Sequence, residues 1–189
     1  MQKFLYFTMN PLLQSLAQGD RRTTHGVDEV VALCLKNPGN LVQLADAFAL
    51  PANTVRMRAL DALEKISQQR AELLLPLASQ ILQLHAQVGM VKEDLWNLTQ
   101  ILPRLRLPWN QVQKLLPRLQ TQLAHPSRIA AAAALQALVE FSFCFPQLQP
   151  AVLAMVLQSA KSDAPSLRAR AKHLLKLLEK KQPFPSKSD

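Results

Sequence analysis

The chain has 189 residues, of which 49% are hydrophobic and 5% aromatic, with a formal net charge of +9. This length suits one ordinary domain or one short array of repeats. Thirteen prolines against four glycines favour helices separated by prolines, and they exclude glycine-rich phosphate loops. No run of about 18 apolar residues is present, so we expect no membrane-spanning helix.

The first nine residues resemble a signal peptide only faintly, because their apolar core is short and Asn10-Pro11 follows it directly. We therefore expect a cytoplasmic protein. Residues 1–9 are interpreted as a dispensable extension, with Met9 as an alternative start. The pattern then predicts a short helix over 11–18, a turn over 19–26 and a helical stripe that begins at Val27. Asp28 and Glu29 lie in the first turn of that helix, where carboxylates complement the helix dipole.

The segment 55–66 carries its apolar residues at i, i+4, i+7, i+8 and i+11, which is the spacing of one stripe on an α-helix. The pattern recurs three more times downstream. Ala59 is matched by Leu98, Ala134 and Ala171, at steps of 39, 36 and 37 residues (98−59, 134−98, 171−134). A single helix cannot bury its own stripe, so each copy must pack against the next one, as in a solenoid.

Another helix is predicted before each copy, over 41–50, 72–88, 109–123 and 147–161. Pro76 and Pro150 occupy corresponding places and predict turn-like entries to their helices, since proline is best tolerated in a first turn. Pro117 lies in mid-helix and predicts a kink. Asn53 or Thr54 can cap the first copy, and Ser127 can cap the third.

Four stretches resemble small bacterial HEAT-repeat proteins: GDRRTTHGVDEVVALCLKNP, VRMRALDALEKIS, WNLTQILPRL and PSLRARAKHLLKLL. The resemblance covers roughly residues 19–179. It implies an all-α, right-handed HEAT-like α-solenoid of about four and a half helical hairpins, with the first helices convex and the second helices lining a concave face. The turns before Val55 and Ala130 lack the aspartate that HEAT repeats often place there, which leaves Asp163 before the last helix. Residues 1–181 are expected to form one domain, followed by a disordered tail over 182–189.

Helix phase places one row of side chains on the concave face of such a solenoid: Arg58, Asp61, Lys65, Trp96, Gln100, Arg104, Gln136, Glu140, Arg170 and His173. We therefore expect a monomeric, non-enzymatic scaffold that binds another protein through this face. Trp96 has two interpretations: an exposed binding anchor, or structural filling, which is favoured. The alanine run 130–134 likewise indicates either close helix packing, which is the default for a central repeat, or a groove for a partner.

The C-terminal half is the basic half, with a formal charge of +4 over 101–160 and +5 over 161–189. A face lined by basic side chains could follow the phosphate backbone of a nucleic acid: Arg104, Arg128, Arg168, Arg170 and Lys172. Nucleic-acid binding is thus the alternative function. The simpler interpretation, which we favour, is that these charges complement a helix dipole and keep a leucine-rich chain in solution.

No catalytic residue, metal site or cofactor site is predicted. The four histidines lie in different repeats without zinc-ligand spacing: His25, His85, His125 and His173. Cys34 and Cys144 lie on apolar stripes, where a thiol behaves as a small hydrophobe. Some HEAT-like solenoids are DNA glycosylases, and the available raw material for such an enzyme is Trp96, Trp109 and Asp61, onto which no motif can be mapped.

Overall fold

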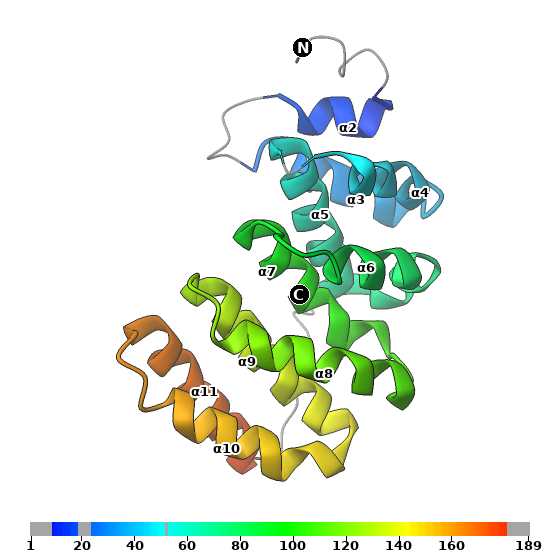
Figure 1. Cartoon of the computed structure of the whole chain (residues 1–189). Coiled ribbons are helices and arrows are strands. Elements are labelled where there is room, and N and C mark those ends of the chain that lie inside the picture. The colour runs from blue at the N-terminus through cyan, green and yellow to red at the C-terminus, as the bar shows by residue number, and fades with distance from the viewer. Residues whose placement is uncertain (1–8, 19–23, 52, 181–189) are drawn as a thin grey trace. The chain divides into compact units, whose positions relative to one another are not determined.

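A computed structural model describes residues 9–18, 24–51 and 53–180. Within these ranges the chain consists of helices and connecting turns and has no strand, which confirms the all-α class (Figure 1). No helix found there has the length and apolar character needed to cross a membrane. The predictions made for residues 1–8, for 19–23 in the first turn and for the tail over 182–189 lie outside the described residues.

The helices group into two compact units, residues 1–98 and 99–189. The division falls inside one helix, α7. That residues 1–181 form one domain stays a prediction. The first unit contains α2 (Pro11–Leu16), α3 (Val27–Lys36), α4 (Asn40–Ala45), η2 (Asp46–Ala49), α5 (Thr54–Arg70), η3 (Ala71–Leu77), α6 (Ala78–His85) and most of α7 (Lys92–Ile101), where η marks a 3₁₀ helix.

The first unit is built around α5, which packs against α2, α3, η2 and η3. Its apolar stripe is buried as predicted: Val55, Ala59, Ala62, Leu63 and Ile66. The side chain of Asn53 caps the helix by accepting a hydrogen bond from the backbone N–H of Arg56 at 2.9 Å, so the predicted cap is confirmed. Burial extends well beyond the stripe and includes charged side chains. The apolar pattern of the sequence did not predict that these charged side chains are buried.

The second unit contains the end of α7, η4 (Leu102–Leu105), α8 (Trp109–Leu123), α9 (Arg128–Cys144), η5 (Pro146–Leu148), α10 (Gln149–Ser159) and α11 (Pro165–Lys180). Its central helix is α9, which contacts α8, α10 and α11; α10 and α11 also lie side by side (Figure 1). Ala130, Ala131, Ala133 and Ala134 are buried. Their small side chains let neighbouring helices approach α9 closely, which is the close-packing interpretation of the alanine run.

A buried polar contact joins three elements of the second unit. The side-chain amide of Gln122 in α8 donates to the hydroxyl of Thr99 in α7 at 3.0 Å and to the carbonyl of Ala130 in α9 at 2.9 Å. Gln122 and Thr99 are both buried. Because each polar group has a partner, their burial does not carry the full desolvation cost of an unpaired group.

The prolines behave as expected where they enter helices. Pro76 lies in the 3₁₀ segment η3 that precedes α6, and Pro150 occupies the first turn of α10. Pro117 lies inside α8, which continues through it from 109 to 123; the kink there stays a prediction. Ser127 occupies the N-cap position of α9, but its side chain makes no capping hydrogen bond. Instead its backbone N–H donates to Nδ1 of His125 at 3.0 Å.

The two cysteines differ, which corrects the prediction that both lie on apolar stripes. Cys34 in α3 is buried, and burial raises the pKa of its thiol to about 11. Cys144 is exposed at the last position of α9. Helical phase places Cys144 on the same side as the buried Phe141, three positions earlier, so its exposure follows from its place at the end of the helix and not from its phase.

Candidate binding surfaces

Arg58, predicted on the exposed row, is buried with 1% of its surface accessible. Its guanidinium donates hydrogen bonds to the carbonyl of Leu16, the last residue of α2, at 2.7 Å, and to that of Gln18, two residues beyond the helix. A cation suits this place because the last carbonyls of a helix lack partners within the helix and carry partial negative charge. The residue therefore holds α2 against α5 and is not part of a surface.

Arg56, the other arginine in the first turns of α5, is also buried, and it forms an ion pair with Asp94 of α7. Its Nε donates to Oδ2 of Asp94 at 2.7 Å and its Nη2 lies 2.6 Å from the same oxygen, while Nη1 donates to the carbonyl of Leu50 at 2.9 Å. The two side chains are 9% and 1% exposed. In the sequence Asp94 looks like a polar replacement of Val55 in the stripe. The structure instead makes it the partner of an arginine 38 residues earlier in the chain.

Asp61 and Lys65 of the predicted row lie together, and Asp28 of α3 joins them. Lys65 Nζ is 2.8 Å from Oδ1 of Asp28 and 3.7 Å from Oδ2 of Asp61. Burial raises the pKa of Asp61, and the lysine offsets this only in part. Burial alone would lower the pKa of Lys65, but its hydrogen bond to Asp28 and the charge of Asp61 together raise it. The pKa values of both Asp61 and Lys65 can be raised because the lysine bonds chiefly to Asp28. Its contact with Asp61 is longer and therefore weaker.

Three residues of the row come from α7 and η4. Trp96 has 39% of its surface accessible, so it is an exposed side chain rather than core filling. Its neighbour one turn earlier, Lys92, is also exposed. Gln100 and Arg104 are half-buried in the second unit. An accessible tryptophan can supply a large contact area to a partner.

The remaining residues of the row lie in the second unit, where three of them form a chain of hydrogen bonds. The side-chain amide of Gln136 donates to Oε1 of Glu140 at 2.9 Å, and its oxygen accepts from Nη1 of Arg170 at 3.0 Å. The contact joins α9 to α11. His173 is exposed one turn further along α11. Three residues predicted on the row, Gln136, Glu140 and Arg170, are therefore in contact, as are Asp61 and Lys65.

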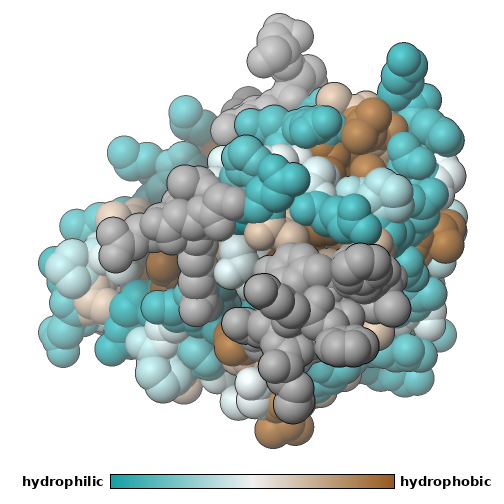
Figure 2. All heavy atoms as spheres, turned by 90° about the horizontal axis from the view of Figure 1, so that it is seen from above, coloured by the Kyte–Doolittle hydropathy of each residue, from teal (hydrophilic) through white to brown (hydrophobic). Residues whose placement is uncertain are grey.

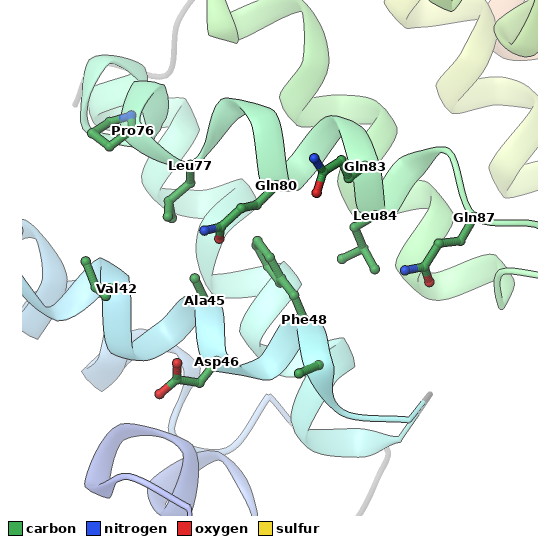
Figure 3. A pocket seen from close by; sticks show the side chains of 11 residues that line it. Val42, Ala45, Asp46, Phe48, Pro76, Leu77, Gln80, Gln83, Leu84 and Gln87 are labelled. Carbon is green, nitrogen blue, oxygen red and sulfur yellow. The ribbon is translucent and has the colours of Figure 1, made fainter.

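A groove of about 540 Å³ that the sequence did not predict lies in the first unit, between α4 with η2 and η3 with α6. Figure 3 shows Phe48 pointing from η2 towards α6, with Leu77 and Leu84 facing it. Among its lining residues Asp46 carries a charge, and its Oδ2 accepts a hydrogen bond from Nδ2 of Asn10 at 2.9 Å. The rim bears the amides of Gln80, Gln83 and Gln87. The groove suits apolar contact, and its lining does not select a particular ligand.

The exposed charges are unevenly divided between the units. On the face shown in Figure 2 hydrophilic side chains predominate among the described residues, with hydrophobic ones in separate spots. In the second unit, eight of the described lysines and arginines are exposed: Arg106, Lys114, Arg128, Lys161, Arg170, Lys172, Lys176 and Lys180. Lys172, Lys176 and Lys180 follow one another at i, i+4 and i+8 on α11.

Two of the three residues considered for catalysis make structural contacts. Trp109 packs against Phe145 with ring centroids 5.2 Å apart and the rings tilted by 39°, and Asp61 faces Lys65. Across the described ranges no three histidine, cysteine or acidic side chains gather in a way that could hold a metal ion. Comparisons with family models, with curated proteins and with solved structures found no match to this chain.

Proposed function

We propose that this chain is a HEAT-like helical-repeat protein that acts as a non-enzymatic scaffold and binds a protein partner through its second helices. The second helices are α3, α5, α7, α9 and α11. The partner-binding surface is the predicted row without Arg58, which is buried. A cytoplasmic location agrees with two free thiols, one of them exposed, since such thiols persist in a reducing compartment.

The observation that carries the repeat proposal is a set of side-chain pairs between successive second helices. Lys65 pairs with Asp28 over 37 residues, and Arg56 pairs with Asp94 over 38 residues. In the second unit Arg170 pairs with Gln136 over 34 residues. These separations are close to the period of the sequence repeat. Stacked copies of one hairpin would bring together residues one period apart, as these pairs do.

The surface proposal rests on what the pairs leave accessible. Trp96 is exposed on α7, and the half-buried amide of Gln100 lies four positions further along the same helix. An aromatic anchor beside a group that both donates and accepts hydrogen bonds is typical of protein recognition surfaces.

A capture experiment with matched variants tests this surface. The row variant combines Trp96→Ser and Gln100→Ala. The control variant makes the same types of change at accessible positions of the first-helix side, Leu75→Ser and Gln80→Ala.

We expect full-length wild type and the control variant to retain the same protein from the native cell extract, and the row variant to lose it. Proteins bound equally by all three forms would contradict the surface. If wild type retains no protein, the scaffold proposal itself is wrong.

A further inference from the structure

The two units carry formal charges of opposite sign. In the first unit the described residues include six lysines and arginines against eight acidic residues, a net −2. In the second unit the corresponding numbers are eleven against three, a net +8. Such an excess of one sign destabilises a compact unit through self-repulsion and attracts a partner of opposite charge.

The densest part of this charge is the outer face of α11. Lys172, Lys176 and Lys180 are all exposed and follow one another one turn apart, with a rise of about 6 Å between neighbours. They lie opposite the buried residues Leu167 and Ala171. Like charges at i and i+4 lower the stability of a helix, so the three lysines destabilise α11. Among the described residues none of the three lysines takes part in an ion pair.

We propose that the row Lys172, Lys176 and Lys180 binds the phosphate backbone of a double-stranded nucleic acid without reading its sequence. This inference does not rest on the scaffold function, which uses other residues. Lysine is a point charge that neutralises phosphates wherever they lie, and a basic stripe along one helix is the electrostatic footprint of nucleic-acid binding.

The composition around the three lysines argues against a protein as the partner of this row. Besides Arg170 and His173, which belong to the proposed protein-binding surface, the accessible positions of α11 hold Pro165, Ser166, Ala169, Lys172, Lys176, Glu179 and Lys180. Lysine, serine and alanine are depleted at protein interfaces, where aromatic anchors are enriched, and this face has no Phe, Tyr or Trp. The same lack of stacking rings disfavours single strands, whose binding depends on bases stacked on aromatic side chains.

The test measures binding of the full-length chain to a random-sequence duplex of about 20 base pairs by fluorescence anisotropy at several salt concentrations. Each neutralised phosphate contributes about −0.9 to the slope of log K against log salt, so three lysines give a slope of about −2.7. Affinity should therefore fall about 40-fold between about 50 mM and about 200 mM salt.

Two variants with equal loss of charge locate the contact. The row variant is Lys172→Gln with Lys176→Gln and Lys180→Gln. The control variant is Lys114→Gln with Arg128→Gln and Lys161→Gln, all exposed positions of the same unit. We expect the row variant to lose most of the salt slope and the control to keep most of it, while circular dichroism shows both forms folded.

Four results would overturn the proposal. Wild type that binds no duplex at low salt excludes the activity. Equal loss in both variants means that diffuse charge, and not the row, holds the duplex. A polyglutamate peptide that competes as well as duplex of equal charge identifies an acidic protein as the partner. Tighter binding to a single strand of equal length excludes a duplex surface.

Discussion

Gly26 is the residue at which the backbone of the first unit leaves no room for a side chain. It precedes α3 with φ of 76°, in the left-handed region, and a Cβ placed on it would lie 2.7 Å from the carbonyl oxygen of Ser15. Gly89 has a similar φ of 73°, but a Cβ there would meet nothing within 4 Å. The two glycines share a backbone conformation and differ in surroundings.

Alanine substitution should therefore separate the two costs. Gly89→Ala should lower the free energy of unfolding by about 1 kcal/mol, the cost of the left-handed conformation alone. Gly26→Ala should lower it by about 3 kcal/mol, because the clash with backbone adds to that cost. Urea unfolding followed by circular dichroism measures both. Equal losses of unfolding free energy would mean that the turn before α3 can shift to make room for the added Cβ.

The buried charges of α5 show which features of the fold could not be predicted from the sequence. The stripe of α5 and the alanine core of α9 were predictable, because periodicity of apolar residues is a local property. The positions of Arg56 and Arg58 were not, since their acceptors lie 38 and 42 residues away along the chain. Hydrophobic pattern assigns arginine to solvent, whereas an arginine with several acceptors can be buried.

The same reasoning holds for the surface. Lys65 with Asp61, and Gln136 with Arg170, were predicted on one row and do lie close together, because helix phase alone fixes the faces of α5, α9 and α11. Arg58 was assigned by the same phase and is buried, since α2 covers that side of α5. The groove beside Phe48 was not foreseen because it depends on two 3₁₀ segments, η2 after α4 and η3 before α6, which the periodicity of apolar residues does not predict.

The link between α5 and α7 makes a prediction about elements. Asp94→Ala removes the carboxylate from a pair that is 9% and 1% exposed, which leaves Arg56 buried without its counter-ion. We expect a loss of about 3 kcal/mol in the free energy of unfolding. Asp28→Ala breaks the accessible pair with Lys65 and should cost less than about 1 kcal/mol.

Chemical denaturation of the two single variants gives the comparison, and a double variant completes it. Arg56→Met with Asp94→Leu removes both charges and should recover a large part of the loss, since apolar replacement of a buried pair is often neutral. An Asp94→Ala variant no less stable than Asp28→Ala would show that the ion pair contributes little.

At the scale of the whole molecule, the division of charge should make the two units respond differently to salt. The described residues of the second unit carry +8 and those of the first −2. Raising NaCl from about 20 mM to about 500 mM shortens the range of repulsion. Hydrogen exchange read by mass spectrometry should therefore slow more in peptides from 99–180 than in peptides from 24–98.

Sucrose provides the control, because an excluded neutral solute favours burial in both units alike. A salt response of equal size in the two units would mean that self-repulsion within the second unit is negligible.

The bonds from Arg58 to the carbonyls at the end of α2 have a consequence for the architecture of the first unit. A six-residue helix at the start of the described chain looks expendable by size. Yet Leu16, its last residue, and Gln18, just beyond it, supply acceptors for the buried guanidinium of Arg58. Removing the chain up to Val27 would therefore leave this cation in the core without those acceptors. Proteolytic loss of α2 should accordingly weaken the packing around α5.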